Sequence, residues 1–138
     1  MILNSANQTK EFAKDFLAQL NGRSVIALEG SLGAGKTTFV QGLAESLGIK
    51  KRVLSPTFVF LRSYKLENQP FRIFHHFDLY RCQSERDVKS IGLEEILLDK
   101  DCLIAIEWPK VAKEILPRNS VWLKFKKINE NSREIEIF

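Results

Sequence analysis

The feature that most constrains this chain is a glycine-rich octapeptide at residues 30–37, with the sequence GSLGAGKT. It fits the pattern G-x-x-x-x-G-K-[S/T] at every required position. Its glycines let the backbone turn sharply and direct successive N–H groups inward onto an anion. The helix that follows points the positive end of its dipole at the same place. The motif therefore predicts a phosphate-binding loop between a buried strand and a helix.

The side chains of the octapeptide and of the residue after it indicate which phosphates they bind. Lys36 places a compact positive charge against the β- and γ-phosphates of a nucleotide. The Thr37 hydroxyl is placed to ligate Mg²⁺, and the Thr38 hydroxyl to bond the α-phosphate. The predicted nucleotide contacts are six consecutive residues: Gly33, Ala34, Gly35, Lys36, Thr37 and Thr38.

The rest of the chain alternates helical and strand patterns. Ser5 and Gln8 have the spacing of a capping box at the start of a helix that ends at Asn21-Gly22. A buried strand at 25–28 precedes the loop, and a helix follows it from near Gly35 to near Gly48. The order predicts a three-layer α/β fold with a mixed sheet in a single domain, residues 1–138. The remaining predicted elements are strands at 57–64, 71–80 and 103–106, helices at 85–98 and 110–116, and an antiparallel strand pair, 121–125 and 133–138, at the edge of the sheet.

Composition fits one small globular domain. The 138 residues are 44% apolar and 28% charged, which excludes a disordered or collagen-like chain. The net charge of +4 predicts a mildly basic, mainly solvated surface. Cys82 and Cys102 form no metal-binding set, and we expect both to be reduced. No signal peptide is visible and no apolar run approaches the roughly 20 residues of a membrane span, so we expect a cytoplasmic protein.

An acidic residue at the end of an apolar strand is the first candidate to complete a nucleotide site. Glu107 follows the apolar run 102–106, which is the Walker B pattern. This pattern puts a carboxylate at the carboxyl edge of a strand near the phosphate loop, where it acts through a metal-bound water or polarises the attacking water. A charged strand end that only meets solvent is the alternative.

Three further segments carry weaker signals. Strand alternation puts His76, Asp78 and Tyr80 on one face, which suggests a site or a polar strand face without one. Residues 55–58 (SPTF) resemble a nucleotide-sensing switch or an ordinary entry into a strand. Trp108, next to Glu107, is placed to cover the site, to meet a partner or to anchor the core.

Four motifs together resemble the TsaE family of bacterial P-loop ATPases, which are needed to make threonylcarbamoyladenosine in tRNA. They are residues 30–39 (GSLGAGKTTF), 55–58 (SPTF), 76–81 (HFDLYR) and 106–109 (IEWP). The motifs occur in the family's order with similar spacing, and the last three make the resemblance specific. Ser31 departs from the family's usual Asp, which puts only local charge tuning in doubt. The resemblance implies a three-layer P-loop NTPase fold with a central mixed, mostly parallel sheet.

The same resemblance implies a function and its partners. The chain would bind ATP with Mg²⁺, hydrolyse it slowly alone, and reset a complex with TsaB and with TsaD, which modifies the tRNA. It would meet tRNA through that complex, with no membrane or DNA partner. By position, the resemblance implies phosphate contacts at Lys36 and Thr38, metal organisation by Thr37 and Glu107, support of hydrolysis by Asp78, and contacts to base or ribose by Thr9 and Arg133. It leaves open whether Asp78 or Glu107 is the base.

Two other functions fit the loop less fully. A small P-loop kinase for a nucleoside or metabolite would need an Arg-rich lid and an acceptor pocket, for which 138 residues leave little room. A nucleotide-sensing RNA-binding module would use two basic clusters, Lys50-Lys51-Arg52 and Lys124/Lys126/Lys127.

Overall fold

The computed structural model describes residues 1–50 and 60–138. Within them one sheet has the strand order β1-β7-β6-β2-β5-β4-β3, in which β6, β2, β5 and β4 are parallel neighbours and the other pairs are antiparallel. The predicted mixed, mostly parallel sheet is confirmed. The strands are β1 (Ile2–Leu3), β2 (Val25–Gly30), β3 (Leu61–Lys65), β4 (Ile73–Asp78), β5 (Cys102–Glu107), β6 (Val121–Lys127) and β7 (Arg133–Ile137).

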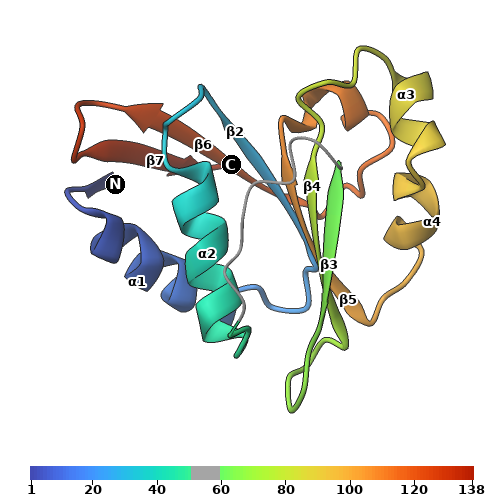
Figure 1. The fold of residues 1–138 in the computed structure, drawn as a ribbon, viewed down its shortest axis with the longest axis horizontal. Helices are drawn as coiled ribbons and strands as arrows, with labels where there is room; N and C mark the ends of the chain where they lie inside the picture. The colour runs from blue at the N-terminus through green and yellow to red at the C-terminus, as the bar shows by residue number, and fades with distance from the viewer. Residues whose placement is uncertain (51–59) are drawn as a thin grey trace.

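Helices cover both faces of the sheet and make three layers (Figure 1). A hydrophobic core lies on each face of the sheet, and side chains that alternate along β2 contribute to both. Ile26 and Leu28 pack with α1 and α2, and Val25 and Ala27 pack on the opposite face. Burial on both sides explains why this strand reads as one continuous apolar run. Within the described residues, no helix is long and apolar enough to cross a bilayer. The helices are α1 (Ala6–Ala18), α2 (Lys36–Ser46), α3 (Glu85–Ser90), α4 (Leu93–Leu97) and a 3₁₀ helix, η1 (Pro109–Ala112).

The helix that carries the phosphate loop is held closely against α1. The predicted cap of α1 is present, because the Gln8 N–H donates to Ser5 Oγ at 3.1 Å. Further along, Gly42 of α2 meets α1 so closely that a Cβ there would lie 2.7 Å from Lys10 Cα and 2.9 Å from Ala13 Cβ. The missing side chain therefore lets the backbones of α1 and α2 approach each other closely.

The phosphate loop leaves β2 under an equally tight constraint. Gly30 has φ +147°, and a Cβ there would lie 2.6 Å from the Phe125 carbonyl oxygen of β6. A side chain at this position would push the loop away from the sheet. The loop therefore starts at the carboxyl end of β2, beside the carboxyl ends of β5 and β4.

Four predictions of local structure were wrong. The helix predicted at 85–98 is divided at Gly92 into α3 and α4, and the helix predicted at 110–116 is only the 3₁₀ turn η1. The strand predicted at 71–80 is shorter, because β4 ends at Asp78. The final strand pair is not at the sheet's edge, because β1, too short to show a pattern, pairs outside β7. Of the strand predicted at 57–64, residues 57–59 lie outside the described part of the chain.

Candidate nucleotide-binding site

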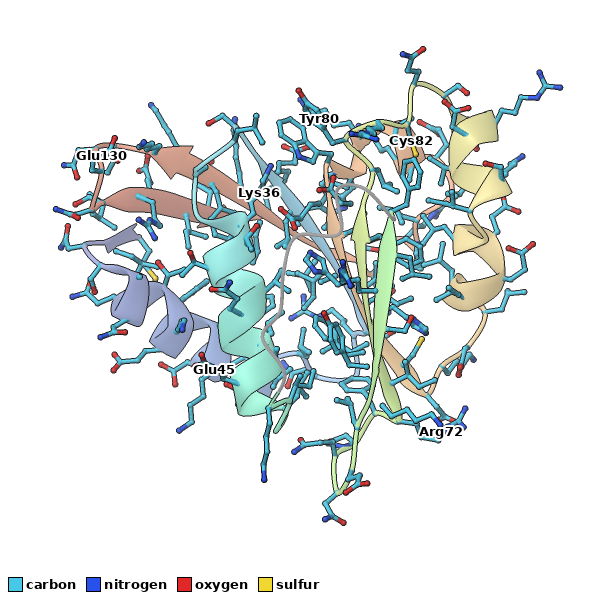
Figure 2. The ribbon with its side chains drawn as sticks, in the orientation of Figure 1. Lys36, Glu45, Arg72, Tyr80, Cys82 and Glu130 are labelled. Carbon is cyan, nitrogen blue, oxygen red and sulfur yellow. The ribbon has the colours of Figure 1, made fainter. Side chains whose placement is uncertain are left out.

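A cleft of about 470 Å³ opens where the carboxyl ends of β2, β4 and β5 meet the start of α2. Figure 2 shows Lys36 and Tyr80 at this end of the molecule and Glu45 at the far end of α2. Leu32 also lines the cleft, although the sequence did not single it out, together with Tyr80 and Trp108, which the sequence placed near a possible site. The predicted site residues that line it are Gly33, Gly35, Lys36, Thr37, Thr38, Asp78, Glu107 and Arg133.

The phosphate loop has the backbone that an anion cradle needs. Gly35 precedes α2 in a left-handed conformation, φ +106° and ψ +7°, which side chains rarely adopt. The first N–H groups of a helix have no partner within it, and Lys36, Thr37 and Thr38 at the start of α2 line the cleft. Ala34 is buried and does not line the cleft, and its N–H donates to the Ser31 carbonyl at 3.2 Å. The cradle therefore rests on the N–H groups at the start of α2.

Lys36 is almost completely buried at the floor of this cleft, with 4% of its surface exposed. Its Nζ donates to the Gly30 carbonyl and lies 3.6 Å from the centroid of the Trp108 ring. Burial lowers the pKa of this ammonium, while the nearby charges of Glu107 and Asp78 raise it. The ammonium thus lies against an aromatic face, within the electrostatic influence of two acids, in the place where a phosphate charge would be bound.

Trp108 reaches Lys36 because its backbone is in an unusual conformation. At φ +58° and ψ +55° it occupies the left-handed region, which is rare for a bulky residue. Its ring also packs against Tyr80, with the ring centroids 5.0 Å apart. Such backbone conformations cost of order 1–3 kcal/mol and cluster at functional sites. Of the roles that the sequence left open for Trp108, this geometry supports two, because the ring lies over Lys36 in the cleft and also packs against the core on that face of the sheet.

The two acids lie side by side at the ends of neighbouring parallel strands. Asp78 of β4 and Glu107 of β5 are paired in register, and only 4% and 3% of their surfaces are exposed. Asp78 Oδ1 accepts from the Tyr80 N–H at 2.9 Å. Glu107 Oε2 lies 2.6 Å from His76 Nε2. The predicted position of Glu107, at a strand end near the phosphate loop, agrees with this arrangement. Asp78 was predicted within a longer strand and lies at a strand end because β4 stops there.

The side chains that line the cleft suit Mg²⁺ bound together with a substrate better than they suit a metal coordinated by protein ligands alone. Mg²⁺ is usually held by one or two carboxylates together with substrate phosphates and water. Two acids and the Thr37 hydroxyl line the cleft. No group of three or more His, Cys, Asp or Glu that could hold a metal occurs in the described part of the chain. The residues present therefore fit a metal ion that is coordinated partly by protein side chains and partly by a bound phosphate.

Thr9 and Arg133 are brought together, although they are far apart in the sequence. Arg133 Nη1 donates to Thr9 Oγ1 at 3.1 Å, and the Thr9 hydroxyl donates to the Ser5 carbonyl at 3.2 Å. Arg133 lines the cleft and passes so close to Gly35 that a Cβ there would lie 2.8 Å from its Cδ. Thr9 is fully buried and is absent from the cleft's lining, so its contact is with the arginine.

One interaction at the site was not anticipated from the sequence. His76 was placed on the face of Asp78 by alternation, but its contact with Glu107 depends on the register between β4 and β5. That register sets His76 opposite Ala105, one diagonal step from Glu107. Residues 55–58, proposed as a switch, lie outside the described part of the chain.

Comparisons with known proteins identify the family to which this chain belongs. The family model described as "Threonylcarbamoyl adenosine biosynthesis protein TsaE" matches residues 3–135. A protein of Borreliella burgdorferi named "tRNA threonylcarbamoyladenosine biosynthesis protein TsaE" is 38% identical over 99% of this chain and 98% of its own length. A Bacillus subtilis protein of the same name is 38% identical over 93% of this chain and 77% of its own. The crystal structure of YdiB from Bacillus subtilis matches with a TM-score of 0.72 and 29% identity over 98% of this chain and 80% of that one. This chain therefore belongs to the TsaE family of P-loop ATPase-type proteins.

Proposed function

We propose that this chain is a cytoplasmic ATPase subunit that binds ATP with Mg²⁺ and works in the threonylcarbamoyladenosine modification of tRNA. The observation that carries the proposal is the buried ammonium of Lys36, which lies at the start of α2 under the influence of Glu107 and Asp78. A buried lysine at a helix start, beside two acids and a glycine loop, suits a polyphosphate together with its metal. The names of the curated relatives support the pathway.

The chain's own groups supply binding and charge stabilisation. The N–H groups at the start of α2 bind phosphate oxygens, and Thr38 adds a hydroxyl bond. Lys36 exchanges the Gly30 carbonyl and the Trp108 ring for the phosphates, and its charge stabilises the negative charge that develops on them. Thr37 and Glu107 would hold Mg²⁺, which neutralises phosphate charge when it is bound. Arg133 reaches the cleft from the side of β7 and offers a positive charge to the nucleotide.

The two carboxylates are the groups available to orient a water molecule and to accept its proton. Asp78 and Glu107 both line the cleft, and either serves as the base in this proposal. We propose that turnover is slow in the isolated chain and rises with the partners TsaB and TsaD. ATP hydrolysis would then reset that complex, and tRNA would be reached through it.

The decisive test measures ATP binding and hydrolysis with and without TsaB and TsaD. We expect K36A to weaken binding of the fluorescent analogue MANT-ATP, and E107A to bind it but to lose turnover. Phosphate release without transfer to a panel of nucleosides and metabolites separates an ATPase from a P-loop kinase. The proposal fails if the wild-type chain binds no nucleotide, or if E107A keeps wild-type turnover in the assembled complex.

A further inference from the structure

The inference concerns His76, whose imidazole lies beside the site without lining the cleft. It is fully buried, with 0% of its surface exposed. Its Nε2 lies 2.6 Å from Glu107 Oε2, which is also almost completely buried. A carboxylate oxygen only accepts, so Nε2 carries the hydrogen of this bond. A short bond between a ring N–H and a buried carboxylate is one of the stronger kinds in proteins.

The bond to His76 uses one of the two carboxylate oxygens of Glu107, and the other oxygen stays available to a ligand in the cleft. Glu107 Oε2 is occupied by the histidine, whereas Oε1 makes no hydrogen bond to the residues that the structure describes. Glu107 nevertheless lines the cleft. The bond to His76 therefore fixes the rotation of the carboxyl group and keeps one oxygen away from a ligand.

A role limited to filling the core does not account for this histidine. His76 Nδ1 is buried and has no hydrogen-bond partner among the described residues. Burying a polar ring atom without a partner costs about 1–3 kcal/mol, which an apolar side chain of similar size would avoid. The neighbouring His75, on the opposite face of β4, instead has its Nδ1 2.7 Å from Ser63 Oγ. The ring of His76 is thus oriented toward Glu107 at the expense of its second nitrogen.

We propose that His76 is a positioning residue that holds the Glu107 carboxylate in the orientation required for metal-assisted ATP hydrolysis. The inference rests on the proposed ATPase function and adds a residue that acts only through Glu107. Groups that orient a metal-binding side chain typically change metal affinity or activity 10–100-fold when they are replaced.

The test compares substitutions of His76 that keep or remove the N–H group bonded to Glu107 Oε2. The amide nitrogen of H76Q reaches the place of Nε2, that of H76N matches Nδ1 instead, and H76L has neither. With TsaB and TsaD present, we expect H76L and H76N to lower kcat by about 10–100-fold with little change in KM, and H76Q to restore most of it. The matched control is H75Q, on the other face of the same strand, which should keep wild-type kcat.

A second readout uses no turnover. In the isolated chain, MANT-ADP binding without metal should be the same in H76L and wild type, while H76L should need about 10–100-fold more Mg²⁺ to strengthen that binding. Urea unfolding shows which variants fold, and if H76L does not, the comparison of H76N with H76Q decides.

The outcomes separate this inference from the function on which it rests. A wild-type chain that neither binds nor hydrolyses ATP refutes the function itself. If the wild type is active, wild-type kcat in H76L and H76N, or equal losses in H76N and H76Q, overturns the positioning role. The role also fails if H76L lowers the residual activity of E107A further, because a residue that acts through Glu107 has no effect once that carboxylate is gone.

Discussion

Replacing Gly42 with alanine tests whether the contact between α1 and α2 is as tight as the structure shows. Helix propensity alone favours the change by about 0.8–1.0 kcal/mol. The added methyl, however, would lie 2.7 Å from Lys10 Cα, 3.0 Å from the Lys10 carbonyl oxygen and 2.9 Å from Ala13 Cβ. None of these atoms belongs to a side chain that can rotate away, so we place the cost near the upper end of the roughly 1–3 kcal/mol for overpacking.

The net expectation is a loss of about 2 kcal/mol in the free energy of unfolding, or about 6 °C in Tm for a domain of this size. Urea unfolding followed by far-UV circular dichroism measures it. The control is a double-mutant cycle with A13G, which removes the methyl that faces Gly42, so G42A should cost less in that background. Because α2 begins at Lys36, MANT-ATP binding should weaken in G42A as well. A G42A protein that is more stable than wild type would refute this reasoning.

Three more outcomes follow from the site and the two cores. In W122F the remaining tryptophan is Trp108, so ATP should change its emission when Lys36 leaves the ring, whereas W108F should show no change in fluorescence. Burial lowers the pKa of Lys36, so between that pKa and the ordinary value of 10.5 the unfolded chain binds more protons than the folded one. Urea unfolding should therefore show wild type gaining stability relative to K36M as the pH rises toward 10.5, and parallel pH curves would contradict this. Burial raises the pKa of the Cys102 thiol to about 11, so peptide mass spectrometry should find iodoacetamide on the half-buried Cys82 first, and on Cys102 only after unfolding.

Most of the architecture could be predicted from periodicity and from local signals. The buried run of β2, the octapeptide and the capped start of α1 each indicate their structure within a few residues. The failures have two causes. The strand β1 exists because it pairs with β7, a contact that no short window contains. The helix predicted at 85–98 overrode a local signal, because Gly92 takes a left-handed conformation that divides α3 from α4.

The residues of the site fall into two similar groups, those indicated by a local motif and those whose contacts depend on the fold. Residues whose chemistry is tied to a local motif, such as Lys36 and Glu107, line the cleft. The bond between His76 and Glu107 needed the register of two strands, and the Trp108 ring over Lys36 needed a left-handed backbone. Sequence reasoning therefore found the candidate groups of the cleft but missed much of what they contact.

The tight approach of Phe125 to Gly30, and of Arg133 to Gly35, bears on how the protein is made. Both contacts come from the last two strands, β6 and β7, whereas the glycines belong to the first third of the chain. A nascent chain on the ribosome has therefore completed the whole octapeptide long before it synthesises the surfaces that shape it. A product truncated after β5 would carry an intact motif without the sheet strand that supports it, and a motif search would count it as functional.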